Sequence, residues 1–185
     1  MVTLTPAPSA EQIVIASPSP QAQAGPDGRF TLSGVVPGRY FVRAQGIVKS
    51  AIINGTDTLD FPLEITGRDD VANAVITVTD RVSELAGRLT EATGQPGSDY
   101  TIVIAPDDRR YWTPGSRRIL TTRPGTDGAY VLRGLPPGSY HLAAVTDMEP
   151  GGQFDPEFLS ALTGASTRVT ILEGAKAVQD LRVAR

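Results

Sequence analysis

Large hydrophobic residues recur at every second position in two stretches of the chain that lie one hundred positions apart. Phe30 and Leu32 are separated by a polar residue, and Tyr130 and Leu132 repeat this spacing in the second stretch. Side chains with a period of two lie on the same face of a β-strand. The pattern therefore predicts a strand with one buried face in each stretch.

The two strands belong to a longer phrase that the chain contains twice. Residues 26–44 read PDGRFTLSGVVPGRYFVRA, and residues 126–144 read TDGAYVLRGLPPGSYHLAA. In each copy an Asp-Gly turn precedes the first strand, and a Pro-Gly bend leads to a second strand that carries a tyrosine. Two short strands and two tight turns are typical of a β-sandwich. A repeat at this spacing predicts two domains, residues 1–80 and 81–185.

The phrase has the pattern D-G-x-[FY]-x-L-x-G-[LV]-x-P-G-x-Y, which resembles the carboxypeptidase regulatory-like domain. Residues 85–97, LAGRLTEATGQPG, are similar to the opening strand and turn of that family. The resemblance implies an all-β fold of two tandem immunoglobulin-like (transthyretin-like) antiparallel β-sandwiches, related to the starch-binding-like group. It also implies an accessory module, because the zinc ligands of metallocarboxypeptidases belong to their catalytic domain. No zinc site carries over.

The first copy differs from the second in its opening strand. Residues 2–6 align without a gap to residues 102–106, and the second copy has a strand at residues 84–90 before this point. We therefore expect that the sequence begins inside its first domain, as part of something longer. The alternative is that the first domain is a six-stranded variant. An edge left unpaired by the missing strand would invite another chain or segment to add on.

Local signals place the remaining elements. A two-residue turn is predicted at Asn54-Gly55. The second copy should carry the one short helix, with Asp155 as its cap, Pro156 in its first turn and Gly164 at its end. Phe158, Leu159 and Leu162 give that helix one apolar stripe. Further strands are expected at residues 13–15, 49–53, 58–65, 74–79, 100–105, 119–123, 167–172 and 178–183.

Composition narrows the function classes. The 185 residues include 19 glycines and 15 prolines but no cysteine, which fits many short strands and excludes disulfides and thiolate metal sites. A net charge of -3 provides no basic field for nucleic acid. No stretch approaches the ~20 apolar residues of a membrane span. The first residues do not form a signal peptide, so an extracellular, periplasmic or cell-surface location would require a signal that is not in this sequence.

The loop after residue 106 is the most unusual candidate binding site. It places the only tryptophan, Trp112, beside Tyr111, Arg110 and Arg109. Flat aromatic rings next to hydrogen-bonding groups can stack on a sugar or anchor a protein partner. In the alternative interpretation, Trp112 covers the end of the sandwich and the two arginines pair with neighbouring aspartates.

Few other residues form a pattern typical of metal binding or catalysis. His141 is the only histidine, which removes two-histidine metal sites, and the alternation predicts that it is half exposed on a strand. The carboxylates of residues 147–157 lack the regular spacing of a calcium loop, and no serine has a G-x-S-x-G setting. We therefore expect no enzyme activity, metal or cofactor. The predicted role is a structural or interaction module of a larger exported bacterial protein, whose partners are other domains of the parent chain or envelope proteins. Glycan binding by the 107–112 loop is the alternative.

Overall fold

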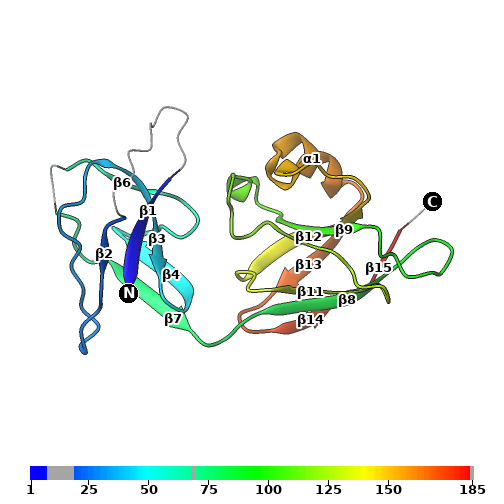
Figure 1. Cartoon of the computed structure of the whole chain (residues 1–185), viewed down its shortest axis with the longest axis horizontal. Coiled ribbons are helices and arrows are strands. Elements are labelled where there is room, and N and C mark those ends of the chain that lie inside the picture. Colours follow the sequence, from blue (N-terminus) through cyan, green and yellow to red (C-terminus); the bar gives the residue numbers. More distant parts are fainter. Residues whose placement is uncertain (8–18, 68–69, 184–185) are drawn as a thin grey trace. The chain divides into compact units, whose positions relative to one another are not determined.

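The computed structural model describes residues 1–7, 19–67 and 70–183. The chain divides into two compact units, Met1–Asp80 and Arg81–Arg185, and each is described by itself. Both units consist mainly of antiparallel strands, and the one α-helix among the described residues belongs to the second unit (Figure 1). The predicted all-β sandwich class is confirmed.

One sheet of the second unit has the strand order β10-β9-β12-β13, with all neighbours antiparallel. Its central strand β9 is buried from its second residue to its last, because the sandwich core covers one face and a helix covers the other. This double burial explains the continuous apolar run at residues 102–105. The strands are β9 (Thr101–Pro106), β10 (Leu120–Thr122), β12 (Gly138–Val145) and β13 (Thr167–Ile171).

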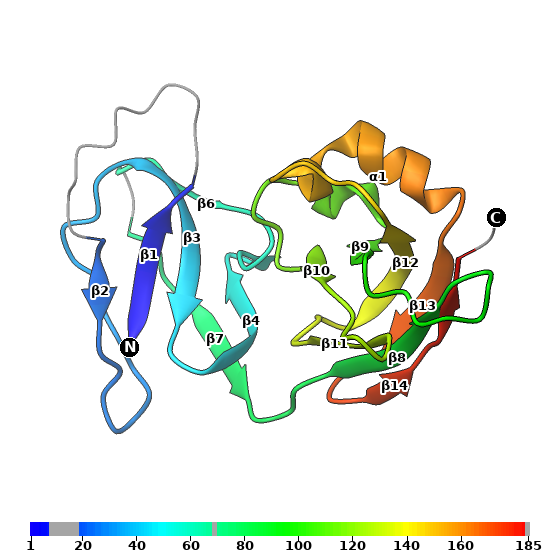
Figure 2. The same cartoon turned by 45° about the vertical axis from the view of Figure 1, so that its right-hand side comes forward.

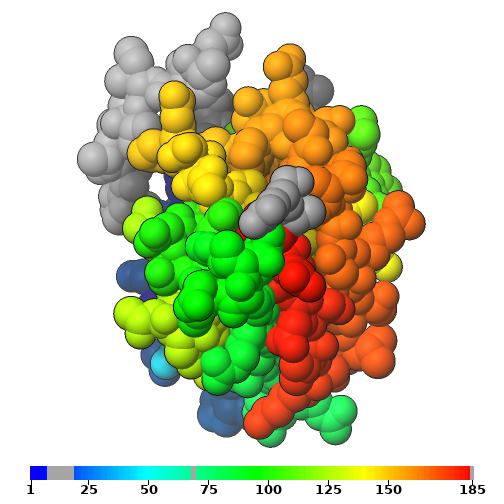
Figure 3. All heavy atoms as spheres, turned by 90° about the vertical axis from the view of Figure 1, so that its right-hand side faces the viewer, coloured from blue at the N-terminus to red at the C-terminus, as the bar shows by residue number. Residues whose placement is uncertain are grey.

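The facing sheet of the second unit is organised around β8. This strand pairs antiparallel with β11 on one edge and parallel with β14 and then β15 on the other. Figure 3 shows the last strands, in red, at the surface against the green residues of the β8 region. The strands are β8 (Glu84–Thr90), β11 (Ala129–Arg133), β14 (Lys176–Val178) and β15 (Leu181–Arg182).

Close backbone approach explains a glycine in the middle of β8. A Cβ atom at Gly87 would overlap the carbonyl oxygen of Gln179 and approach the hydroxyl of Tyr130. The Tyr130 hydroxyl donates a hydrogen bond to the same Gln179 carbonyl. Burial, with a smaller contribution from the charge of Asp180, raises the pKa of Tyr130 to about 12. Gly87 thus permits the contact between β8, β11 and the chain after β14.

The repeated phrase forms the same two turns in both units. The Asp27 and Asp127 carboxylates each accept a hydrogen bond from a backbone N–H two residues later, at 3.0 Å, and the glycine after each has φ near +79°. The hydroxyl of Tyr40 donates to the Val36 carbonyl at 2.9 Å, and the second copy repeats this contact at Tyr140. The predictions of the two Asp-Gly turns are therefore confirmed.

The helix α1 (Pro156–Thr163) begins as its sequence predicts. The Asp155 carboxylate accepts a hydrogen bond from the Glu157 N–H, and Pro156 occupies the first turn, where its missing N–H costs nothing. Leu159 and Leu162 are buried. They cover the outer face of the β9–β12 sheet, which gives the second unit an apolar layer outside its sandwich core.

The first unit has a four-stranded sheet of order β2-β1-β3-β6 and a three-stranded sheet of order β5-β4-β7 (Figure 2). Its core is built from both sheets and includes Leu4, Tyr40, Val42, Ala51 and Ile53. The strands are β1 (Val2–Pro6), β2 (Gln21–Ala22), β3 (Gly38–Ala44), β4 (Ile47–Ile53), β5 (Thr56–Asp57), β6 (Leu63–Ile65) and β7 (Val75–Thr79).

Two strand predictions for the first unit are wrong. Phe30 and Leu32 lie in an irregular segment and not in a strand, because no described strand pairs with it as β8 pairs with β11. Residues 58–62 form a bend between β5 and β6, since the Asp57 carboxylate accepts hydrogen bonds from the Ala51 and Leu59 N–H groups and turns the chain. In the second unit, the strand predicted at 178–183 is divided between β14 and β15.

The turn between β4 and β5 agrees with its sequence. Asn54 has φ of 50° and Gly55 has φ of 79°, both in the left-handed region that this two-residue connection requires. The strand predicted at residues 13–15 lies outside the described residues.

Candidate functional site

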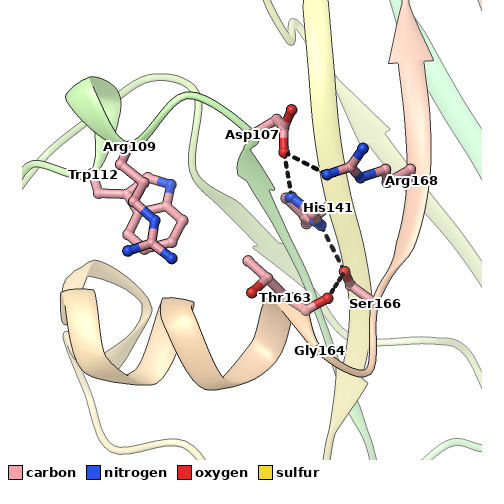
Figure 4. A pocket seen from close by; sticks show the side chains of 8 residues that line it. All are labelled: Asp107, Arg109, Trp112, His141, Thr163, Gly164, Ser166 and Arg168. Atoms are coloured by element: carbon pink, nitrogen blue, oxygen red, sulfur yellow. Dashed lines mark hydrogen bonds and ion pairs between the residues drawn. The ribbon is translucent and has the colours of Figure 1, made fainter.

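A polar hollow of about 370 Å³ lies on the outer face of the second unit, between the loop after β9 and the end of α1 (Figure 4). It is bordered by strands β12 and β13, so four separate segments contribute to it. The lining residues are Asp107, Arg109, Trp112, His141, Thr163, Gly164, Ser166 and Arg168.

The loop after β9 is held in shape by its own side chains. Asp108 accepts a hydrogen bond from the Arg110 N–H and so caps the short helix η1 (Arg109–Tyr111). This turn directs Trp112 inward, where its indole N–H donates to the Pro106 carbonyl at 2.8 Å. The Trp112 residue is 8% exposed and packs against Leu159 of α1. Trp112 therefore packs inward against the unit, as the alternative interpretation of the loop predicts.

The two arginines of the loop have different surroundings. Arg110 forms a salt bridge with Asp108 at 2.6 Å, and this hydrogen-bonded pairing holds the pKa of the Asp108 carboxyl below its usual value and raises that of the guanidinium. Arg109 instead lies over the ring of Trp112, with its guanidinium carbon 5.0 Å from the ring centre. Figure 4 shows this stacking on the side of the hollow away from His141.

Of the four residues predicted to bind a ligand, Arg109 and Trp112 line the hollow, and Arg110 and Tyr111 do not. Tyr111 contacts the guanidinium of Arg118, whose carbon lies 4.3 Å from the ring centre. Ligand binding by these four residues remains a prediction.

His141 is buried, and the prediction that it is half exposed is wrong. Its residue is 5% exposed, because α1 and the turn that follows it cover this face of β12. The ring nitrogen Nε2 lies 2.7 Å from Oδ1 of Asp107, and Nδ1 lies 2.7 Å from Oγ of Ser166. Arg168 also donates to Oδ1 of Asp107, at 3.3 Å (Figure 4).

The Ser166 hydroxyl links the histidine to the end of the helix. Its oxygen lies 2.9 Å from the carbonyl of Thr163 as well as 2.7 Å from His141. Because the hydroxyl has a single hydrogen, it donates to one of these two partners at a time.

The network joins segments that are far apart in the sequence. Asp107 directly follows β9, His141 lies in β12, Ser166 directly precedes β13 and Arg168 is the second residue of β13. The Ser166 hydrogen bond to Thr163 fixes the last turn of α1 to this set. Sequence reasoning missed these partners because they meet only in the folded sheet. The signal available in the sequence was that Ala143 and Val145, on the same face of β12 as His141, are apolar, which favours a covered face.

Acidic side chains are not gathered into a metal site. Within residues 1–7, 19–67 and 70–183, no group of three or more His, Cys, Asp or Glu side chains is placed to hold a metal ion. Asp155 of the candidate calcium segment caps α1. No helix in the same ranges has the length and apolar character needed to cross a membrane.

Comparison with known proteins identifies no family. No protein-family model and no curated protein matches the chain. Among solved structures, it is similar to a streptococcal ancillary pilin, with 14% identity over 89% of this chain and 50% of that one and a TM-score of 0.39. It is also similar to the minor pilin of Streptococcus agalactiae, with 15% identity over 98% of this chain and 80% of that one and a TM-score of 0.38.

A third similarity is to catechol 1,2-dioxygenase from an Acinetobacter species, with 13% identity over 57% of this chain and 53% of that one and a TM-score of 0.34. The chain spans half the length of the ancillary pilin. At these TM-scores, no functional conclusion follows from the similarities. The relation to the carboxypeptidase regulatory-like domain remains a resemblance in the repeated phrase.

Replacing Asp107 tests whether the buried network stabilises the second unit. Asp107→Ala should lower the free energy of unfolding by about 1–2 kcal/mol, because it leaves Nε2 of the buried His141 without its partner. Urea unfolding followed by the fluorescence of Trp112, the only tryptophan, measures this unit selectively. Asp99→Ala is the matched control and should change the stability little, since this aspartate of the same unit is exposed and its oxygen lies 3.5 Å from the neighbouring Ser98 hydroxyl. Equal effects of the two substitutions would contradict the assignment.

Proposed function

We propose that the chain is a non-catalytic structural and interaction module of a larger exported bacterial protein, in which rigid sandwiches space or present other domains. Its partners would be other domains of the parent protein or proteins of the cell envelope. The module would hold other domains at fixed distances and present fixed surfaces to them, and it would catalyse no reaction.

The observation that supports this proposal most directly is the way the hollow uses its polar side chains. His141, Asp107 and Ser166 hydrogen-bond to one another and to the end of α1. Buried polar networks whose members are all paired rigidify the structure that they join. Here they hold the helix and the loop on the outer face of the sheet, and this supports a stabilising role for the hollow.

The same three residue types also occur in hydrolases, so their geometry needs comparison with a catalytic triad. In a triad, the serine hydroxyl donates to the histidine and attacks the substrate with its oxygen. Here the Ser166 oxygen lies within hydrogen-bond distance of the Thr163 carbonyl as well, which competes for its single hydrogen. The histidine side chain is 7% exposed. Both features favour a structural network over a nucleophile and base.

Removal of the serine hydroxyl separates the two interpretations. Purified chain and the Ser166→Ala variant should have the same background rate on panels of ester and peptide substrates, because no step depends on this oxygen. Matched circular dichroism spectra of the two proteins provide the control for folding. A turnover rate in the parent chain that Ser166→Ala abolishes would contradict the proposal and make the network a catalytic one.

Glycan binding is the second candidate, and one observation favours it. The hollow lies beside the predicted loop and is lined by Arg109 and Asp107, which can donate to and accept from sugar hydroxyls. Stacking of a sugar on Trp112 is less favoured, since the indole is 8% exposed and Arg109 covers its ring. A glycan would therefore be held by polar contacts beside the indole.

Trp112 reports on this candidate through its fluorescence. We expect a blue emission maximum and weak quenching by iodide, because the indole is buried, and no change on addition of soluble glycans. The variant Arg109→Ala, which uncovers the ring, should increase quenching and so shows that the assay can detect exposure. A saturable spectral shift with one class of sugar, lost in Arg109→Ala, would instead establish the 107–112 loop as a carbohydrate site.

A further inference from the structure

The two copies of the repeated phrase differ in how much apolar surface they bury. In the second unit, Tyr130 and Leu132 are 2% and 3% exposed. The matching residues of the first unit, Phe30 and Leu32, pack against its core but remain partly exposed. The sequence is equally apolar at these positions, so the difference must come from what covers them.

The covering element in the second unit is β8. Its residues Leu85 and Leu89 are each 1% exposed and belong to the same core cluster as Tyr130 and Leu132. Along β11 the register runs from Ala129 opposite Arg88 to Arg133 opposite Glu84. The first unit has no counterpart of β8 among its described residues.

The backbone shows the same difference. The Gly134 N–H donates to the Ser83 carbonyl at 2.9 Å and so continues the β8–β11 ladder. In the first unit, the backbone of residues 30–35 makes no hydrogen bond with the backbone of any other described residue. Unpaired N–H and C=O groups next to partly exposed apolar side chains are the features to which an added strand binds.

The last strand of the first unit pairs on one side only among the described strands. In the second unit β8 lies between β11 and the terminal strand β14 and pairs with both. In the first unit the terminal strand β7 pairs with β4, and no other described strand pairs with it. Val75 and Val78 of β7 are each 57% exposed. The second unit thus shows, within the same chain, what completes such a sheet.

We propose that residues 29–34 form a docking site for one β-strand contributed by a separate partner polypeptide, added antiparallel as β8 is added to β11. This rests on the proposed interaction role and names the partner's chemistry: an extended segment with two leucines four residues apart and two small residues directly after the first leucine. In β8 these are Leu85, Leu89, Ala86 and Gly87. The leucines would bury Phe30 and Leu32, and the backbone would pair with residues 30, 32 and 34.

In the second unit, the side chain of Tyr130 explains why a glycine lies in the middle of β8. Gly87 lies opposite Tyr130, and a Cβ there would approach the tyrosine hydroxyl. The equivalent residue of the first unit is Phe30, which has no hydroxyl, so the opposing position of the partner strand has more space. The essential features of the partner are therefore the spacing of its leucines and backbone N–H and C=O groups that are available for pairing.

A peptide with the sequence of residues 83–91, SELAGRLTE, is a direct probe of the site. It should bind the full chain saturably, and hydrogen exchange of the bound state should slow at the amides of residues 30, 32 and 34. The amides of residues 130, 132 and 134 should not change, because their own strand already covers them. Fluorescence anisotropy of labelled peptide measures the binding constant.

Two altered peptides provide matched controls. N-methylation at the position of Gly87 leaves every side chain unchanged but removes one ladder donor and blocks close approach, so it should weaken binding by about tenfold or more. Serine in place of the leucines matching Leu85 and Leu89 should weaken it at least as much, because the apolar contacts are lost.

Several outcomes would overturn the proposal. The first two are absence of saturable binding and equal affinity for the N-methylated and the unmodified peptide. The third is slowed hydrogen exchange at residues 130–134 when the peptide is added. The fourth is a stable dimer of the free chain whose interface slows hydrogen exchange at residues 30–34. The last would make a second copy of this chain the occupant. None of these results alters the Ser166→Ala comparison, so failure of the docking site and failure of the non-catalytic role can be distinguished.

Discussion

Pairing of backbone N–H and C=O groups with a neighbouring strand is the constraint on which this structure depends. The repeated phrase provides an internal comparison, because its two copies share eight of nineteen residues, and one copy pairs with β8 while the other pairs with no described strand along residues 29–33. Next to β8, residues 129–133 form a strand, and its core-facing side chains Tyr130 and Leu132 are 2% and 3% exposed. In the first unit, where no described strand pairs with them, residues 29–33 follow the same Asp-Gly turn but form no strand. The alternating sequence specifies a strand only where another segment completes the ladder.

Features that depend on a few neighbouring residues could be predicted from the sequence. The Asp-Gly turns, the Asn54-Gly55 connection and the start of α1 at Asp155 are each determined by local φ preference or by one side-chain hydrogen bond. The strand predicted at residues 58–65 forms only over its last three residues, because the Asp57 carboxylate accepts hydrogen bonds from two N–H groups and bends the chain before them. That competition between side chain and strand is invisible in the hydrophobic pattern.

The candidate site could be predicted only in part for a similar reason. Alternation placed His141 on the face of β12 opposite the sandwich core, and this is where it lies. It could not indicate that α1 would cover that face, or that Asp107 and Ser166 would meet the ring from two other segments. The loop residues Arg109 and Trp112 were visible as an unusual cluster, but their inward packing depends on Leu159 of the helix. A second apolar layer outside the sandwich thus gives this unit its buried polar network.

Amide hydrogen exchange of the free chain tests the central claim most directly, because it compares the two copies of the phrase in one experiment. If pairing with β8 determines which copy is a strand, the amides of Tyr130, Leu132 and Gly134 should exchange at least about a hundredfold more slowly than those of Phe30, Leu32 and Gly34. Equal protection of the two sets would contradict the account, since it would mean that residues 30–34 are already paired in the isolated chain.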